Sequence, residues 1–133
     1  LYETSLTSIA SRVSGLDLMP SPEVQNGINL NVVDGGDRYE WHVDSNPVTG
    51  LLVLSHCDAE RGGRLLFDRE VTTQTALSLR PGYFLVFDAT SAPHAVEPVV
   101  SHISRVTAPM NFFVVGDMSD RPSDLDSSLY GDV

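Results

Sequence analysis

The sequence predicts a mainly β domain, a sandwich or a small barrel, preceded by one supporting helix. Two observations predict it. Apolar residues recur at steps of three and four near the N-terminus, and the spacing changes to alternation further on. Clusters of Gly, Pro, Asn and Asp then separate many short apolar runs. This is typical of strands joined by turns rather than of strands that alternate with helices.

The helix is expected over residues 2–16. Its apolar stripe is formed by Tyr2, Leu6, Ile9, Val13 and Leu16. Gly15 near its end and the segment Pro20-Ser21-Pro22 after it are stop signals, because glycine favours the left-handed cap and proline cannot continue a helix.

Short strands are expected in the rest of the chain, because runs rich in β-branched and aromatic residues have the length of strands. They are predicted over residues 28–33, 51–55, 64–67, 72–79, 83–87 and 106–115. Turn-forming residues separate them at Asp34-Gly35-Gly36-Asp37, Asn46-Pro47, Arg61-Gly62-Gly63 and Arg80-Pro81-Gly82. Residues 116–133 are rich in Asp and Ser, and we expect an acidic tail there.

Composition narrows the function classes. The chain has 133 residues, enough for one domain with a core, and a net charge of −10, which disfavours nucleic-acid binding. All eight basic residues are Arg, so Schiff-base and P-loop lysine chemistry are excluded. Its one cysteine, Cys57, excludes an internal disulfide, and a reducing, cytoplasmic setting is expected. No apolar run has the length of a membrane span. Because the first residue is Leu rather than Met, a processed product or a piece of a longer chain is expected.

The strongest functional signal is a set of metal-ligating residue types. His42 and Asp44 are two positions apart, so in a strand both side chains point to the same side. His94 lies beyond a later predicted strand, and Arg105 follows it by eleven positions. Two imidazoles and one carboxylate suit Fe(II), and zinc also accepts them. The other histidines, His56 and His102, lack an acidic partner at this spacing and are predicted to be non-ligands.

These residues and the segments around them resemble the Fe(II)/2-oxoglutarate-dependent oxygenases, most closely the prolyl-4-hydroxylase-like branch. The resemblance extends from about Ile28 to Phe113. Besides the His-x-Asp pair, the distal His and the Arg, the matching features are Tyr39, the segment Arg61-Gly62-Gly63-Arg64-Leu65-Leu66-Phe67, the segment from Pro81-Gly82 to Phe87, and His94-Ala95-Val96-Glu97-Pro98-Val99. One position departs from the pattern: Val33 stands where a Tyr often faces the co-substrate.

The resemblance implies a double-stranded β-helix, a jelly-roll or cupin-like barrel, in a single domain over residues 1–133. Residues 1–20 would be the supporting helix, residues 28–115 the β-helix core and residues 116–133 the tail. His42, Asp44 and His94 would be the catalytic metal ligands. Arg105 would pair with the far carboxylate of 2-oxoglutarate, and further co-substrate contacts are expected from Thr107, Tyr39, Asn31 and Val53.

The implied activity is hydroxylation of an unactivated C–H bond with Fe(II), 2-oxoglutarate and O2, coupled to decarboxylation of 2-oxoglutarate to succinate, with ascorbate as an optional reductant. Because Asp44 is present, hydroxylation is favoured over halogenation, in which related enzymes lose this carboxylate. Two alternatives stay open: a cupin-like metalloenzyme that uses no keto acid, and a non-catalytic β-barrel binding module. A small-molecule substrate is favoured over a protein side chain, no nucleic-acid or membrane partner is expected, and the oligomeric state is left open.

Overall fold

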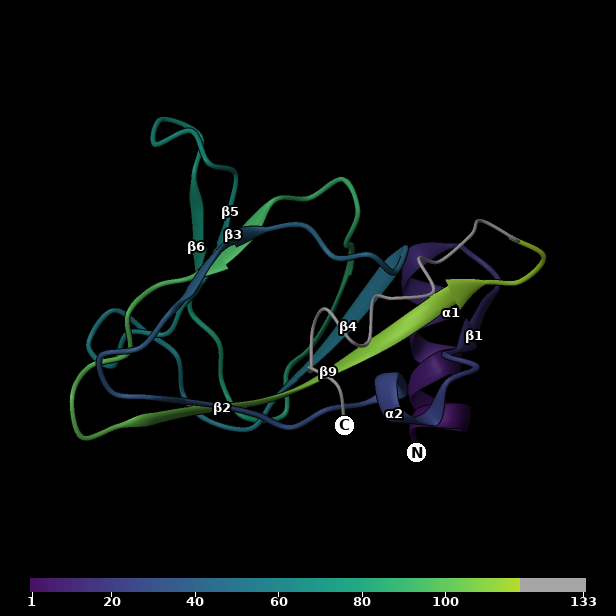
Figure 1. Ribbon diagram of the computed structural model, residues 1–133, viewed down its shortest axis with the longest axis horizontal. Coiled ribbons are helices and arrows are strands. Elements are labelled where there is room, and N and C mark those ends of the chain that lie inside the picture. Colours follow the sequence, from purple (N-terminus) through teal and green to yellow (C-terminus); the bar gives the residue numbers. More distant parts are fainter. Residues whose placement is uncertain (118–133) are drawn as a thin grey trace, which may run out of the picture.

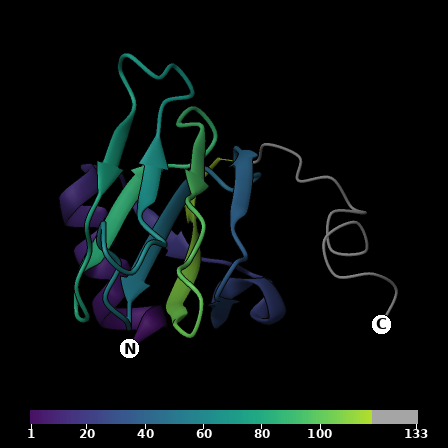
Figure 2. The ribbon, with the colours of Figure 1, turned by 90° about the vertical axis from the view of Figure 1, so that its left-hand side faces the viewer.

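Two antiparallel sheets form the body of the protein. The computed structural model describes residues 1–117. In Figure 1 the long strand β9 crosses the molecule, with α1 beside β1 at one end and the β5–β6 hairpin projecting at the other. Figure 2 looks at the molecule from the end opposite α1, and the same hairpin rises above the other strands.

The helical elements all precede the second strand. They are a π-helical turn η1 (Tyr2–Leu6), α1 (Thr7–Ser14) and the short α2 (Val24–Gly27). The strands are β1 (Leu18–Pro20), β2 (Asn31–Asp34), β3 (Tyr39–His42), β4 (Val48–Val53), β5 (Leu65–Phe67), β6 (Thr75–Leu77), β7 (Phe84–Asp88), β8 (His94–Val96) and β9 (Ser104–Val114).

The larger sheet has the order β1-β9-β4-β7, and β2 also pairs with β9, whereas the smaller sheet has the order β3-β8-β5-β6. All of these pairs are antiparallel. The mainly β jelly-roll prediction with an N-terminal helix is confirmed. Among the described residues the two sheets share no strand, so they do not close into a barrel.

The two faces of the larger sheet carry separate apolar clusters, because alternate side chains of a strand point to opposite sides. On the helix side the buried members are Leu6, Ala10, Leu18, Val48, Ala108, Met110 and Phe112. On the side that faces the smaller sheet they are Leu51, Val53, Cys57, Leu65, Leu79 and Val96. Members of both sheets meet in the second cluster, which therefore holds the two layers together.

The N-terminal helix agrees with its prediction in place and end, but its predicted apolar stripe is wrong, because Ile9, Val13 and Leu16 are exposed whereas Thr7 and Ala10 are buried. Gly15 adopts the left-handed conformation, with φ of 72°, and its N–H donates to the carbonyl oxygen of Ser11 at 2.9 Å. This cap ends α1 at Ser14. The first turn differs from a regular α-helix, because the N–H of Leu6 reaches back to the carbonyl oxygen of Leu1 at 2.9 Å.

Several strand boundaries differ from those predicted. The strand expected over residues 28–33 begins at Asn31, because Ile28 makes only an isolated bridge to Met110. The strand expected over residues 51–55 begins earlier, at Val48. The sequence pattern did not identify the short strands β1 and β8, because β1 contains Pro20 and β8 directly follows Pro93, and a proline within or beside a run argues against a strand.

Within the described residues no helix is long and apolar enough to cross a bilayer. Of the predicted acidic tail, residues 118–133 lie outside the described part of the chain.

Candidate metal centre

Three side chains from distant parts of the chain converge at one place. His42 ends β3, His94 begins β8, and Asp44 lies in the segment between β3 and β4. One potential ligand atom from each lies within 4.8 Å of the other two. Oδ1 of Asp44 is 3.6 Å from Nε2 of His42 and 3.6 Å from Nε2 of His94. Among residues 1–117 this is the only such group of His, Cys, Asp and Glu side chains.

An irregularity in the pairing of β3 with β8 aims both histidines at this place. Tyr39 pairs with Val96 and His42 pairs with His94, so two residues of β3 lie opposite one residue of β8. The extra residue is a β-bulge, which re-aims the side chains that follow it. Since directly paired residues share a face, His42 lies beside His94, with a distance of 4.3 Å between the ring centroids.

Asp44 reaches the centre from outside a strand, which corrects the expectation that a single strand would present both His42 and Asp44. The strand β3 ends at His42. The chain then turns toward the end of β7, where the N–H of Asp44 donates to the carbonyl oxygen of Ala89 at 2.9 Å. The approach of β7, rather than strand alternation, therefore places the carboxylate.

Backbone carbonyls fix the tautomer of both rings. Nδ1 of His42 donates to the carbonyl oxygen of Glu40 at 2.7 Å, and Nδ1 of His94 donates to that of Ala92 at 2.9 Å. Because a carbonyl can only accept, each Nδ1 carries the proton, and a neutral ring keeps a free lone pair on Nε2. The two Nε2 atoms with free lone pairs are the ring atoms that face Oδ1 of Asp44. When a histidine binds a metal through one ring nitrogen, the N–H of its other ring nitrogen usually donates to a carbonyl or carboxylate, as both rings do here.

The centre has one apolar wall and one open side. The ring of His94 packs edge-on against Phe87 at 5.0 Å and lies 6.1 Å from the ring of Phe67. Only 7% of the His94 side chain is exposed, whereas 43% of the His42 side chain is exposed. A molecule from solvent can therefore approach on the His42 side, while the aromatic rings exclude water behind His94.

Arg105 is a buried cation without an acidic partner among the described residues. It is 3% exposed, Nε donates to the carbonyl oxygen of Gly63 at 2.9 Å, and Nη1 donates to the hydroxyl of Thr107 at 3.1 Å. No described Asp or Glu forms an ion pair with it. Burial lowers the pKa of the Arg105 guanidinium, and the neighbouring Cys57 and Tyr39 partly offset this. An arginine nevertheless stays charged at any physiological pH.

The residues predicted to contact the co-substrate occupy the inner side of the sheets. Thr107 of β9 pairs with Val53 of β4 and with Asn31 of β2, so these three side chains form one row across the larger sheet. Thr107 and Val53 are fully buried, and Asn31 is half-buried. Val53 also belongs to the apolar cluster between the sheets. Tyr39 pairs with Val96, a member of that cluster, and is 39% exposed.

Sequence reasoning missed two polar residues of this centre. The hydroxyl of Thr49 donates to Oδ2 of Asp44 at 2.6 Å, and Nδ2 of Asn46 donates to the hydroxyl of Thr49 at 3.0 Å. A signal was present: Thr49, Leu51 and Val53 alternate along β4 and therefore share its inner face. The group of potential ligands contains neither His56 nor His102, whose assignment as non-ligands stays a prediction.

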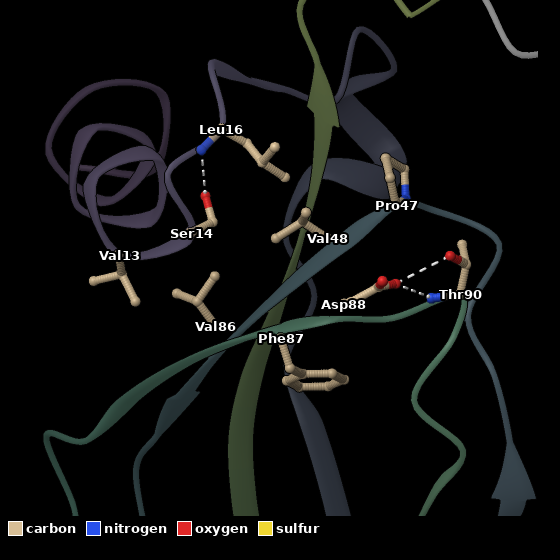
Figure 3. Close-up of a pocket in the computed structure, with 9 residues that line it drawn as sticks. All are labelled: Val13, Ser14, Leu16, Pro47, Val48, Val86, Phe87, Asp88 and Thr90. Carbon is tan, nitrogen blue, oxygen red and sulfur yellow. Dashed lines mark hydrogen bonds between the residues drawn. The ribbon is translucent and has the colours of Figure 1, made fainter.

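A separate apolar hollow lies between the end of α1 and strands β4 and β7 (Figure 3). Its lining residues are Val13, Ser14, Leu16, Pro47, Val48, Val86, Phe87, Asp88 and Thr90. None of the three potential ligands lines this hollow, and Phe87 is the residue that it shares with the wall of the candidate metal centre.

A family model and several solved structures match this chain. A family model described as the 2OG-Fe(II) oxygenase superfamily matches residues 28–113. No curated protein sequence matches the chain. The solved structures that resemble it include EctD from S. alaskensis in its apoform, with 16% identity and a TM-score of 0.67 over 91% of this chain and 56% of that one.

Two further solved structures share the fold. AviO1 from Streptomyces viridochromogenes Tue57 has 16% identity and a TM-score of 0.66 over 88% of this chain and 59% of that one. A Pseudomonas putida prolyl-4-hydroxylase has 20% identity and a TM-score of 0.55 over 65% of this chain and 51% of that one. The chain spans only about half the length of each of these three solved structures.

Proposed function

The chain belongs to the 2OG-Fe(II) oxygenase superfamily, and on that premise we propose that it hydroxylates an unactivated C–H bond, using Fe(II), O2 and 2-oxoglutarate. The observation that carries the proposal is the combination of the three-residue centre with a buried guanidinium that no described carboxylate neutralises. A buried charge is costly unless it is paired, so a bound dicarboxylate is a fitting partner for Arg105.

The donor set fits ferrous iron. Two neutral imidazoles with Nε2 free and one carboxylate oxygen between them form the 2-His-1-carboxylate arrangement that leaves coordination positions open. When bound, the iron supplies the activation of O2 that couples decarboxylation of 2-oxoglutarate to substrate oxidation. His42, Asp44 and His94 are the residues that would hold it. Asp44 would fill the position that a halide takes in related halogenases, so hydroxylation is favoured over halogenation.

The remaining residues have roles in binding and orientation. In the proposed complex, Arg105 has free N–H donors for the far carboxylate of 2-oxoglutarate, since the structure uses Nε for Gly63 and one Nη1 donor for Thr107. Fixing the guanidinium in this way lowers the ordering cost of binding. Asn31 and Tyr39 are proposed as further polar contacts, and Val53 as part of the apolar wall.

A solved structure of EctD carries 2-oxoglutarate and 5-hydroxyectoine, so one protein of this fold binds the co-substrate proposed here. The preference for a small-molecule substrate over a protein side chain stays a prediction. It is tested by adding small molecules and peptides, one at a time, to the same Fe(II)-loaded protein and measuring the succinate released with each.

The proposed function is tested by binding before turnover. We expect the apoprotein to take up one equivalent of Fe(II) or Co(II) under anaerobic conditions, followed by one of 2-oxoglutarate, each measured by calorimetric titration. His42→Ala, Asp44→Ala and His94→Ala should each abolish metal uptake and succinate formation. His56→Ala is the matched control, because His56 is an exposed histidine outside the centre, and it should bind normally.

Two outcomes would overturn the proposal in different ways. Metal uptake without any binding of 2-oxoglutarate would favour a cupin-like metalloenzyme that uses no keto acid. Absence of metal uptake by the folded wild-type protein would leave a non-catalytic binding module.

A further inference from the structure

The two oxygens of the Asp44 carboxylate have different surroundings. Oδ1 faces the two histidines, 3.6 Å from each Nε2. Oδ2 accepts a hydrogen bond from the hydroxyl of Thr49 at 2.6 Å, at the short end of the range for such bonds. The carboxylate is therefore held at one oxygen, and the other oxygen points to the place where the ligand atoms converge.

The direction of the hydrogen bonds around Thr49 is determined by an amide that can only donate there. Nδ2 of Asn46 lies 2.7 Å from the carbonyl oxygen of Val48, which requires a donor, so this atom of the Asn46 amide is the nitrogen. Its second hydrogen points to the Thr49 hydroxyl oxygen at 3.0 Å. Thr49 accepts from Asn46 and has one proton left to give, and that proton goes to Oδ2 of Asp44.

The hydrogen bonds from Asn46 to Thr49 and from Thr49 to Asp44 lie in the protein interior, where a hydrogen bond is strong and its loss is costly. Asn46 is 5% exposed and Thr49 is 4% exposed. Thr49 is also fixed by the sheet, since it pairs with Phe87 of β7 and with Asn111 of β9. A buried hydroxyl on a central strand has little freedom to move, so it can hold a partner that comes from a loop.

We propose that Thr49, supported by Asn46, is a positioning residue that engages Oδ2 of Asp44 and reserves Oδ1 as the single carboxylate ligand atom of the metal. This inference rests on the proposed function, because it assumes that the centre binds a divalent metal. Without the hydroxyl, the carboxylate can rotate about its terminal torsion. Its orientation toward the two Nε2 atoms is then no longer selected.

The experiment measures the dissociation constant for Co(II) alone, by anaerobic calorimetry on the purified apoprotein. Thr49→Val keeps the shape of the side chain and removes the donor, and we expect it to weaken metal binding by about 10- to 100-fold, the usual effect of losing a partner of a ligating residue. Thr49→Ser keeps the hydroxyl and should bind within a few-fold of the wild type. Asn46→Ala removes the N–H that the Thr49 hydroxyl oxygen accepts, so the direction of the Thr49 proton is no longer fixed, and metal binding should weaken by several-fold.

Thr75→Val is the matched control, because Thr75 is an exposed strand threonine, and its metal affinity should equal that of the wild type. Thermal unfolding without metal separates general destabilisation from metal affinity. If Thr49→Val does not fold, the comparison of Asn46→Ala with Thr75→Val decides.

Equal affinities of the wild type, Thr49→Val and Asn46→Ala for Co(II) would overturn the inference while leaving the proposed function intact. Failure of the wild type itself to bind Co(II) would overturn the proposed function and, with it, the inference.

Discussion

The side chain of Arg105 is fixed by the backbone of Gly63: Nε of the arginine donates to the glycine carbonyl oxygen at 2.9 Å. Gly63 adopts the left-handed conformation, with φ of +70°, and a Cβ atom built on it would lie 3.0 Å from Cδ of Arg105. The Gly62-Gly63 turn therefore helps to position the proposed co-substrate site, because the backbone that makes the turn also holds the Arg105 guanidinium.

Gly63→Ala tests this relationship. The added methyl group displaces Arg105 and strains the backbone, so we expect several-fold weaker binding of 2-oxoglutarate and a loss of stability of about 1 kcal/mol. Calorimetric titration of the Co(II)-loaded protein gives the affinity. Gly82→Ala is the matched control: Gly82 has φ of +91° with nothing within 4 Å, so it should lose stability without losing affinity. Equal affinity losses in both variants would refute the link.

Arg105→Gln removes the proposed partner of the 2-oxoglutarate carboxylate. Because hydrogen bonds to charged groups contribute about 1.5–3 kcal/mol, we expect affinity for 2-oxoglutarate to fall by about 10- to 100-fold. The affinity for Co(II) should stay within a few-fold, since Arg105 is not among the potential ligands. Parallel titrations of metal and keto acid distinguish the two effects, and unchanged keto-acid binding would contradict the role proposed for Arg105.

Gly50→Ala tests how closely the larger sheet is packed on its helix side. A Cβ atom there would lie 2.7 Å from Cε2 of Phe112 and 2.7 Å from Cζ of Phe84. Overpacking of this kind costs about 1–3 kcal/mol, so the free energy of unfolding should fall by that amount in urea titrations. In a Phe84→Leu background the cost of Gly50→Ala should be smaller. An unchanged free energy of unfolding would show that both rings move aside freely.

The stability of the turn formed by Asp88, Thr90 and Ser91, between β7 and His94, should depend on pH. The Asp88 carboxylate accepts hydrogen bonds from the hydroxyl of Ser91 at 2.6 Å and from the N–H groups of Thr90 and Ser91 at 3.1 Å. The Ser91 hydroxyl, together with these N–H groups, lowers the pKa of Asp88 below its ordinary value. A lowered pKa in the folded state means that this stabilisation is present above the ordinary carboxyl pKa and is lost as the pH falls through the lowered value.

We therefore expect Asp88→Asn to unfold at a lower temperature than the wild type at neutral pH, and the difference to shrink below about pH 4. Ser91→Ala should raise the pKa of Asp88, followed by NMR titration of the carboxyl group. A difference in unfolding temperature that stays constant down to pH 2 would show that the charge of Asp88 has no part in the turn.

Part of the fold was readable from residues close together in the chain. The helix end at Gly15 depends on one glycine and its own helix, so local chemistry predicted it. The strands β8 and β1 were missed, since each lies at a proline that argues against a strand, and only pairing with β3 and β5 or with β9 makes them strands. The same applies to Asp44, whose place depends on the carbonyl of Ala89 and could not follow from its spacing to His42.

The sequence alone determined which kinds of atoms the protein offers for chemistry: two imidazoles, one carboxylate and one guanidinium, in an order that indicates an oxygenase. These are properties of side-chain types and are present before the chain folds. Tertiary structure alone decided that Nε2 of each histidine is the free nitrogen, that Oδ1 of Asp44 faces the histidines, and that no described carboxylate neutralises Arg105. The physical reason is that each of these outcomes depends on which groups lie within hydrogen-bonding distance of one another, and these groups come together only when the strands pair.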